Sequence, residues 1–124
     1  MRKILVCDDE SSILNILDFS LSAEGYRVIQ AADGDAALAL ASAEQPDLII
    51  LDVMMPKRSG FEVCRLLKAQ RVTADIPVIL LTARGSRDDR ELGREAGADI
   101  HMTKPFSPQR LLDKVHLLLG VRHG

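Results

Sequence analysis

Short, continuous apolar runs alternate with longer stretches of helical period along this chain, and this alternation constrains its fold more than any other feature. The clearest runs are Ile4–Cys7, Leu48–Leu51 and Val78–Leu81. Strands that are apolar on both faces are typical of parallel sheets covered by helices on both sides. Five βα units fit the length of 124 residues. The sequence therefore predicts a single doubly wound α/β domain around a five-stranded parallel sheet.

Periodicity and breaking residues predict the other elements. Tyr26–Ala31 alternates in polarity, which is typical of an edge strand with one face less buried. The last strand is expected near Asp99–Thr103. The expected helices are one that begins after Asp9 with Ser11 or Ser12 as its cap, Ala36–Ala43 before Pro46, a third with Val63, Leu66 and Leu67 on one face, and a last that carries Leu111, Leu112, Val115, Leu118 and Leu119 and ends at Gly120.

The segment Ser86–Ala96 differs from the other helical segments. Leu92 and Ala96 are nearly its only apolar residues, and Gly93 lies inside it. Glycine in a helix interior costs ~1 kcal/mol relative to alanine, and a narrow apolar stripe buries little surface in return. We expect this helix to dock weakly on the sheet.

Composition excludes several classes of function. With a net charge of -2 and 27% charged residues, the chain is typical of a globular domain. Basic residues at Lys57, Arg58 and from Arg84 to Arg94 are not accompanied by aromatic residues, so direct nucleic-acid binding is not expected. Cys7 and Cys64 are too few for a disulfide framework and are not spaced as a metal pair, which favours buried thiols.

The ends of the chain give two further expectations. The apolar run behind Met1 is too short for a signal peptide or a membrane span, which indicates a cytoplasmic location. Residues 1–120 are expected to form the domain, and residues 121–124 a tail or the start of a linker.

Polar residues follow four of the predicted strands at their carboxyl ends. Asp8 and Asp9 follow the first, Asp52 the third, Thr82 the fourth and Lys104 the last. Because these ends meet at one edge of a parallel sheet, and ligands of such sheets bind there, the residues are expected to share one site. Three carboxylates suit a magnesium ion, although Asp8 and Asp9 alone could simply solvate a loop and cap the next helix.

The same set of residues suits phosphoryl chemistry. Asp52 closes the most apolar strand, and carboxylates serve as phosphoryl acceptors. A hydroxyl from Thr82 and an ammonium from Lys104 could spread the negative charge of an acyl phosphate. Either residue alone would usually be structural, so their joint placement carries the prediction.

With these motifs, the chain resembles the receiver domains of two-component response regulators, the chemotaxis regulators among them. The resemblance implies a flavodoxin-like fold with the sheet order 2-1-3-4-5, and it covers the whole chain. The motifs that carry it are Asp8-Asp9, Leu51-Asp52-Val53-Met54-Met55-Pro56, Gly60-Phe61, Leu81-Thr82-Ala83, Gly97-Ala98-Asp99 and Lys104-Pro105-Phe106.

The resemblance implies a role for each acidic residue. Asp52 would be the phosphoacceptor and would share a Mg²⁺ ion, or alternatively Mn²⁺, with the other two aspartates. Asp9 would be a direct ligand and Asp8 would act largely through water. The backbone carbonyl of Met54 would complete the protein ligands.

The phosphoryl group and the switch are implied in the same way. Thr82 and Lys104 would hold the phosphoryl group, and the Lys104-Pro105 bond would be cis. Thr82 would act as a switch with His101, which stands where the family usually has tyrosine or phenylalanine. His101 could instead be a partly exposed histidine that ends a strand. Met54 and Arg84 would flank the phosphoryl site.

The expected function is that of a phosphoryl-accepting switch in a two-component phosphorelay. The donor would be a phosphohistidine on a sensor histidine kinase or a histidine phosphotransfer domain. Phosphorylation would change the face formed by the fourth helix, the last strand and the last helix, and so control a partner or an output domain, with homodimerisation allowed. The domain would catalyse only its own phosphorylation and dephosphorylation, without any contact with a membrane.

Two other functions compete with this one. The chain could be a receiver-like interaction module that works without phosphate. It could also be a magnesium-dependent aspartyl-phosphate hydrolase, but such enzymes place a second acid two residues after the nucleophile. Met54 stands there instead.

Overall fold

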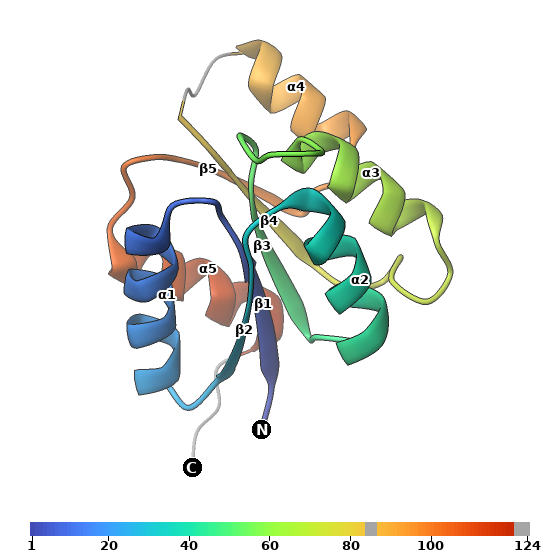
Figure 1. Cartoon of the computed structure of the whole chain (residues 1–124). Coiled ribbons are helices and arrows are strands. Elements are labelled where there is room, and N and C mark those ends of the chain that lie inside the picture. The colour runs from blue at the N-terminus through green and yellow to red at the C-terminus, as the bar shows by residue number, and fades with distance from the viewer. Residues whose placement is uncertain (84–86, 121–124) are drawn as a thin grey trace.

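The computed structural model describes residues 1–83 and 87–120 of the chain. Within these ranges, five strands alternate with five helices, each strand followed by one helix (Figure 1). In chain order they are β1 (Lys3–Cys7), α1 (Ser11–Ala23), β2 (Arg27–Ala31), α2 (Gly34–Glu44), β3 (Leu48–Asp52), α3 (Gly60–Ala69), β4 (Val78–Thr82), α4 (Arg87–Glu95), β5 (Ile100–Thr103) and α5 (Pro108–Leu119).

The strands form one parallel sheet in the order β2-β1-β3-β4-β5. This confirms the doubly wound α/β fold and the sheet order that the resemblance implied. It also confirms the edge position predicted for β2. The central strand β3 is buried along its whole length, whereas β2 is buried only at Ala31. Alternation in β2 therefore reports its place at the edge of the sheet.

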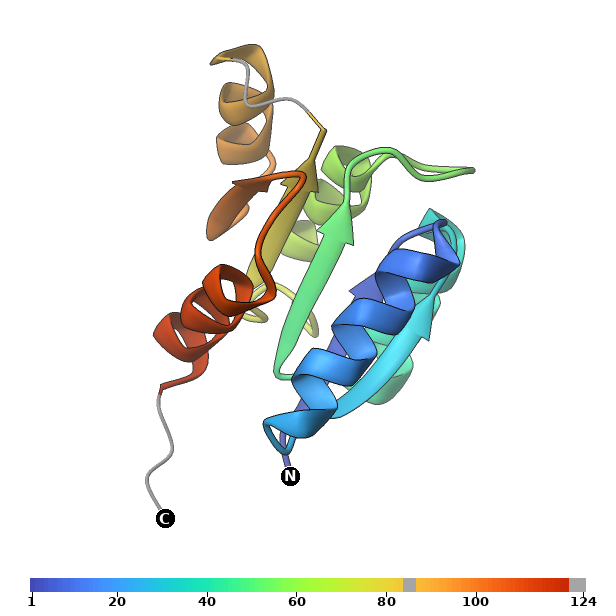
Figure 2. The same cartoon turned by 90° about the vertical axis from the view of Figure 1, so that its left-hand side faces the viewer.

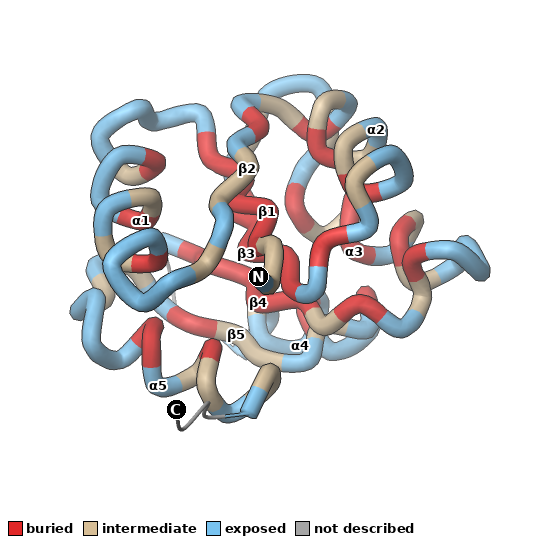
Figure 3. Tube along the Cα trace, turned by 90° about the horizontal axis from the view of Figure 1, so that it is seen from below, coloured by how far each residue is buried: buried red, intermediate tan, exposed pale blue. Residues whose placement is uncertain are grey.

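Two apolar cores lie on opposite faces of the sheet. Helices α1 and α5 cover one face, which Figure 2 shows in front, and α2, α3 and α4 cover the other. Alternate residues of β1 enter different cores: Ile4 packs with Leu17 of α1, and Leu5 packs with Val63 of α3. Buried segments accordingly concentrate in the middle of the molecule (Figure 3). Both faces of the sheet are thus closed, and its ends stay open to ligands.

The start of α1 corrects one prediction. Its N-cap is Glu10, not Ser11 or Ser12, and no side-chain hydrogen bond caps it. The side chain of Asp8 instead accepts a hydrogen bond of 3.0 Å from the backbone N–H of Glu10. The turn after β1 is therefore closed by Asp8, so both serines lie within the first turn of the helix.

Helix α2 begins two residues earlier than predicted. Asp33 adopts an extended conformation, and its carboxylate accepts a hydrogen bond of 2.8 Å from the backbone N–H of Ala36. This is the usual geometry of an N-cap aspartate. Asp33 is therefore the N-cap of α2, and Gly34 is its first residue.

Helix α4 is polar, as expected, but it contacts the sheet through a different residue. Leu92 is 39% exposed, and the one buried residue of the helix is Gly93. Ala96, just after the helix, is buried. The predicted first residue, Ser86, lies outside the described residues. A close approach at a glycine thus replaces the apolar stripe that the sequence suggested.

Both cysteines are free and buried, which confirms that prediction. None of the described helices combines the length and the apolar character that crossing a membrane requires. The proposed tail at 121–124 lies beyond the part of the chain that the structure describes.

Candidate functional site

The carboxyl ends of four strands bring the predicted polar residues to one edge of the sheet. Asp8 follows β1, Asp52 ends β3, Thr82 ends β4 and Lys104 follows β5. In Figure 1 this edge lies away from the N-terminus of the chain. The topology therefore gathers residues that are up to 96 positions apart in the sequence.

Three carboxylates form the centre of this site. One ligand atom from each of Asp8, Asp9 and Asp52 lies within 4.8 Å of the other two. Asp8 and Asp52 are only 0% and 3% exposed, whereas Asp9 faces solvent. Hard cations such as Mg²⁺ prefer carboxylate oxygens and keep several waters, so two buried acids beside one open to solvent fit such an ion.

Lys104 enters the site from the strand on the other side of β4. Its ammonium lies 2.8 Å from Asp8 Oδ2 and 3.2 Å from Asp52 Oδ1. Its backbone N–H donates a hydrogen bond of 2.6 Å to the carbonyl of Thr82, and the Lys104–Pro105 peptide bond is cis. One cation is thus held between two buried acids, beside the hydroxyl-bearing end of β4.

The charge balance of the site follows from this burial. Burial raises the pKa of Asp52, the charge of Asp8 raises it further, and Lys104 and the backbone N–H of Met54 partly oppose the shift. Burial would lower the pKa of Lys104, but its hydrogen bond to Asp8 and the charge of Asp52 outweigh this, so the pKa is raised. The site therefore holds a firmly protonated ammonium beside a carboxylate that would gain from a further cation.

Backbone packing requires a glycine at the start of α3. A Cβ atom on Gly60 would lie 2.4 Å from the backbone oxygen of Asp52, so only glycine allows α3 to start against the end of β3. The N–H of Gly60 also donates to the carbonyl of Val53 at 2.9 Å. Met54, in the loop between Asp52 and Gly60, has a side chain that is 71% exposed. Thr82, at the end of β4, is only 2% exposed.

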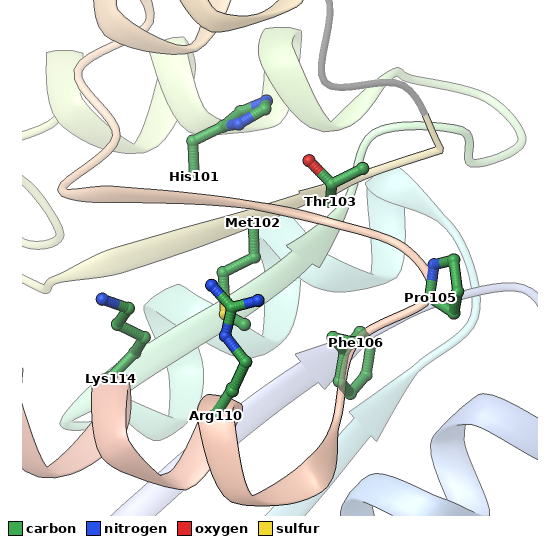
Figure 4. A pocket seen from close by; sticks show the side chains of 7 residues that line it. All are labelled: His101, Met102, Thr103, Pro105, Phe106, Arg110 and Lys114. Carbon is green, nitrogen blue, oxygen red and sulfur yellow. The ribbon is translucent and has the colours of Figure 1, made fainter.

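His101 lies on β5, away from the carboxylates. Figure 4 shows His101 and Thr103 on one side of the strand and Met102 on the other, toward Arg110 and Lys114 of α5. These side chains line a groove of about 310 Å³. His101 thus lies away from the three carboxylates and beneath α4, where a Cβ on Gly93 would lie 3.3 Å from its ring.

The environment of His101 disfavours its charged form. Its Nε2 atom is buried and has no hydrogen-bond partner among the described residues. Burial lowers its pKa, Arg90 adds to this effect, and Asp89 opposes it. The ring is therefore held neutral near pH 7.

Sequence reasoning found the residues that end strands but missed a set of charged contacts beside the site. Lys57 and Arg58, in the loop after β3, pair with Asp33 and Asp35 at the start of α2. The sequence shows two acidic and two basic residues in these segments, but no pattern in it indicates that they form ion pairs. The other predicted residue, Arg84, lies outside the described residues.

Comparison with known proteins identifies the class. The chain belongs to the family of response regulator receiver domains, whose model matches residues 4–116. Receiver domains of this family are signalling switches rather than enzymes, which agrees with an acidic pocket built from Asp8, Asp9 and Asp52.

Particular relatives share the fold and much of the sequence. The alkaline phosphatase synthesis transcriptional regulatory protein PhoP of Bacillus subtilis is 49% identical over 118 residues, which cover 95% of this chain and 48% of that protein. This chain thus spans about half the length of the curated relatives that it matches.

Solved structures of receiver domains and chemotaxis proteins share the fold of this chain. The Vibrio cholerae chemotaxis protein CheY4 is 36% identical, with a TM-score of 0.90 and coverage of 95% of this chain and 98% of that one. The receiver domain of a Pseudomonas aeruginosa sensor histidine kinase, with a magnesium ion coordinated in its active-site cleft, is 30% identical, with a TM-score of 0.89 and coverage of 97% and 98%.

Proposed function

We propose that this domain is a switch in a two-component phosphorelay, in which Asp52 accepts a phosphoryl group from a phosphohistidine. A carboxylate oxygen of Asp52 forms a bond to phosphorus, and the bond from phosphorus to the imidazole nitrogen of the donor breaks. The observation that carries this proposal is the meeting of three carboxylates within 4.8 Å beside the Lys104 ammonium.

Each residue of the site has a role in this reaction. Asp9 would bind Mg²⁺, or Mn²⁺, directly, Asp8 would do so largely through water, and Asp52 and the Met54 carbonyl would complete the protein ligands. The metal would supply positive charge to the transferring phosphoryl group. Lys104 and Thr82 would bind the phosphoryl oxygens, since an ammonium and a hydroxyl are suited to developing negative charge.

The switch is proposed to run from the phosphoryl site to the face of α4, β5 and α5. A phosphoryl group adds ~1.5 to 2 negative charges, which would draw Thr82 and Lys104 toward it. Thr82 ends β4, and its register partner on β5 is Thr103, two residues from His101. Movement at the end of β4 would thus reach His101, and Met54 and Arg84 would influence the lifetime of the phosphoryl group.

The partners follow from this chemistry. A sensor histidine kinase or a histidine phosphotransfer domain would donate the phosphoryl group. The target would be a separate partner or an output domain of a longer chain. The greater length of the relatives, and their names as transcriptional regulators, support the output domain. The domain itself would work in the cytoplasm, as a monomer or homodimer, without binding nucleic acid.

Intact mass tests the proposal. The native chain and Asp52→Asn are incubated with acetyl phosphate, with and without Mg²⁺. We expect one added phosphoryl group that needs both Mg²⁺ and Asp52. If the native chain takes none while another receiver domain is labelled alongside, the proposal is wrong and a phosphate-independent interaction module is the better explanation. Turnover with continued release of phosphate from other phosphate esters would favour a hydrolase.

A further inference from the structure

The loop that follows Asp52 is fixed at its base. It leaves the sheet at Val53, whose N–H donates to the carbonyl of Leu81 at 2.9 Å. It returns at Gly60, whose N–H donates to the carbonyl of Val53 at 2.9 Å. Residues 54–59 therefore form a loop whose two ends are joined by a hydrogen bond, between the end of β3 and the start of α3.

The tip of this loop is attached to the first turn of α2. Arg58 Nε lies 2.8 Å from Asp35 Oδ1, and Lys57 Nζ lies 3.7 Å from Asp33 Oδ2. The carbonyl of Pro56 also accepts a hydrogen bond of 3.2 Å from the N–H of Gly34. We call the two ion pairs, Arg58 with Asp35 and Lys57 with Asp33, the strap.

Packing beneath the strap is close. A Cβ on Gly34 would lie 2.6 Å from Arg58 Cβ and 2.8 Å from the Arg58 carbonyl oxygen. The loop tip therefore lies directly against the backbone of α2. The strap adds to this packing and to the hydrogen bond between Gly34 and Pro56 in keeping the two elements together.

Met54 lies between the fixed base and the strapped tip. Its backbone N–H hydrogen-bonds to the Asp52 carboxylate, and its side chain is exposed, so side-chain packing does little to orient it. The direction of the Met54 backbone is then set by the loop, from Val53 at one end to Arg58 at the other. If the tip came away from α2, the Met54 backbone, whose N–H bonds to Asp52, could turn away from the carboxylates.

We propose that Arg58 is a positioning residue, which holds the Met54 backbone toward the metal site through its ion pair with Asp35. This inference rests on the proposed function, in which the Met54 carbonyl is one of the metal ligands. Arg58 touches neither the phosphoryl group nor the ion. It acts by keeping the loop in the conformation in which the ion binds.

The size of the effect follows from exposure. The side chains of Arg58 and Asp35 are 39% and 54% exposed. Exposed ion pairs contribute little, so loss of this one should weaken Mg²⁺ binding by about threefold rather than abolish it. Arg58 Nη1 also lies 3.0 Å from Glu62 Oε1, but this pair joins the loop to the first turn of α3 and does not reach α2.

The test is the rate of phosphorylation by acetyl phosphate as a function of Mg²⁺ concentration. We expect Arg58→Gln and Asp35→Asn each to raise the Mg²⁺ concentration for half-maximal rate by about threefold, with nearly native rates at saturation. The double variant should be no worse than either single one, because both remove the same ion pair. Glu62→Gln, which leaves the strap intact, is the matched control and should behave as the native chain.

A second measurement separates positioning from stability and from the proposed function. Backbone amide exchange of Met54 and Gly60, followed by NMR without phosphate donor, should be faster in Arg58→Gln than in Glu62→Gln. Unchanged Mg²⁺ dependence in folded Arg58→Gln, or strictly additive effects in the double variant, would overturn the inference. If the native chain took no phosphoryl group, the proposed function would fail, and amide exchange together with Mg²⁺ titration by calorimetry would still decide on the strap.

Discussion

At the scale of single residues, Asp52 shows what the site costs the fold. It is 3% exposed, and burial and the charge of Asp8 raise its pKa above the ordinary value. A native state that raises the pKa of an acid binds its proton more tightly than the unfolded chain does. Asp52 therefore favours folding at low pH, and this contribution is lost as the pH rises through its folded pKa.

The substitution Asp52→Asn should accordingly stabilise the domain at neutral pH. An amide keeps the shape of the carboxyl group without its buried charge, so we expect a gain of roughly 1 kcal/mol, or about 4 °C in Tm, at pH 7.5 without metal. The gain should shrink as the pH falls toward the ordinary pKa of an aspartate side chain, because the native carboxyl group is then protonated and neutral as well. Thermal unfolding in EDTA, followed by circular dichroism at several pH values, measures it.

Asp75→Asn provides the control for this measurement, because Asp75 is exposed and lies in the segment before β4, at the other end of the sheet. It should leave the Tm nearly unchanged at every pH. An Asp52→Asn variant that is less stable than the native chain at pH 7.5 would show that interactions of the ionised carboxylate outweigh its burial.

Residues that end apolar strands could be found from the sequence, because a charged residue directly after a continuous apolar stretch is easily recognised. Asp52 is of this kind, whereas Lys104 follows the more polar strand Ile100–Thr103, and the structure brings the two to 3.2 Å. Arg58 and Asp35 could not, because an ion pair between two surface elements leaves no periodic pattern. Lys57 has a φ of 71°, a conformation that favours glycine. Because a lysine stands there, the sequence does not indicate this conformation.

At the scale of elements, α4 is distinguished by how it contacts the sheet. A Cβ added at Gly93 would lie 3.3 Å from the His101 ring and 3.4 Å from Leu80 Cδ1. Gly93→Ala should gain ~1 kcal/mol of helix propensity, but crowding against His101 and Leu80 opposes this. The glycine thus sets how closely α4 approaches His101.

Crowding at this contact predicts coupling between Gly93 and His101. Gly93→Ala should be more favourable in a His101→Ala background than in the native chain, by about 0.5 kcal/mol or more, since the ring that it crowds is absent. Urea unfolding of the four variants of this cycle gives the coupling free energy. The background His116→Ala, in α5, should leave the effect of Gly93→Ala unchanged, and equal effects in all three backgrounds would contradict the proposed contact.

The elements themselves could be predicted, but their ends could not always be. Five strands and five helices followed from apolar runs and helical period, because burial on both faces of a sheet imposes both patterns. The start of α1 was misplaced because Asp8, two residues before the cap, closes the turn in place of a serine. The contact of α4 at Gly93 could not be predicted, because an apolar pattern marks Leu92 and not the glycine beside it.

At the scale of the whole molecule, the order of the strands is what makes a site. Alternation placed β2 at an edge, but local patterns contain no information on which strands pair across the sheet, so the full order came from the family resemblance. With β1, β3, β4 and β5 as consecutive neighbours, their carboxyl ends converge. Three carboxylates then face one ammonium, which leaves an excess of negative charge that a cation could neutralise.

Mg²⁺ should therefore stabilise the whole domain and not only its site. An ion that binds the native state alone adds about 1.4 kcal/mol at ten times its Kd, which corresponds to roughly 4 °C in Tm. We expect this increase in the native chain and in Asp75→Asn, and most of it to be lost in Asp52→Asn, which removes a ligand and a charge. Thermal unfolding in EDTA and in rising MgCl₂, with NaCl at matched ionic strength, gives the comparison. Because screening by salt acts alike on all three chains, an equal increase in Asp52→Asn would mean that Mg²⁺ stabilises the fold through surface charge and not through this site.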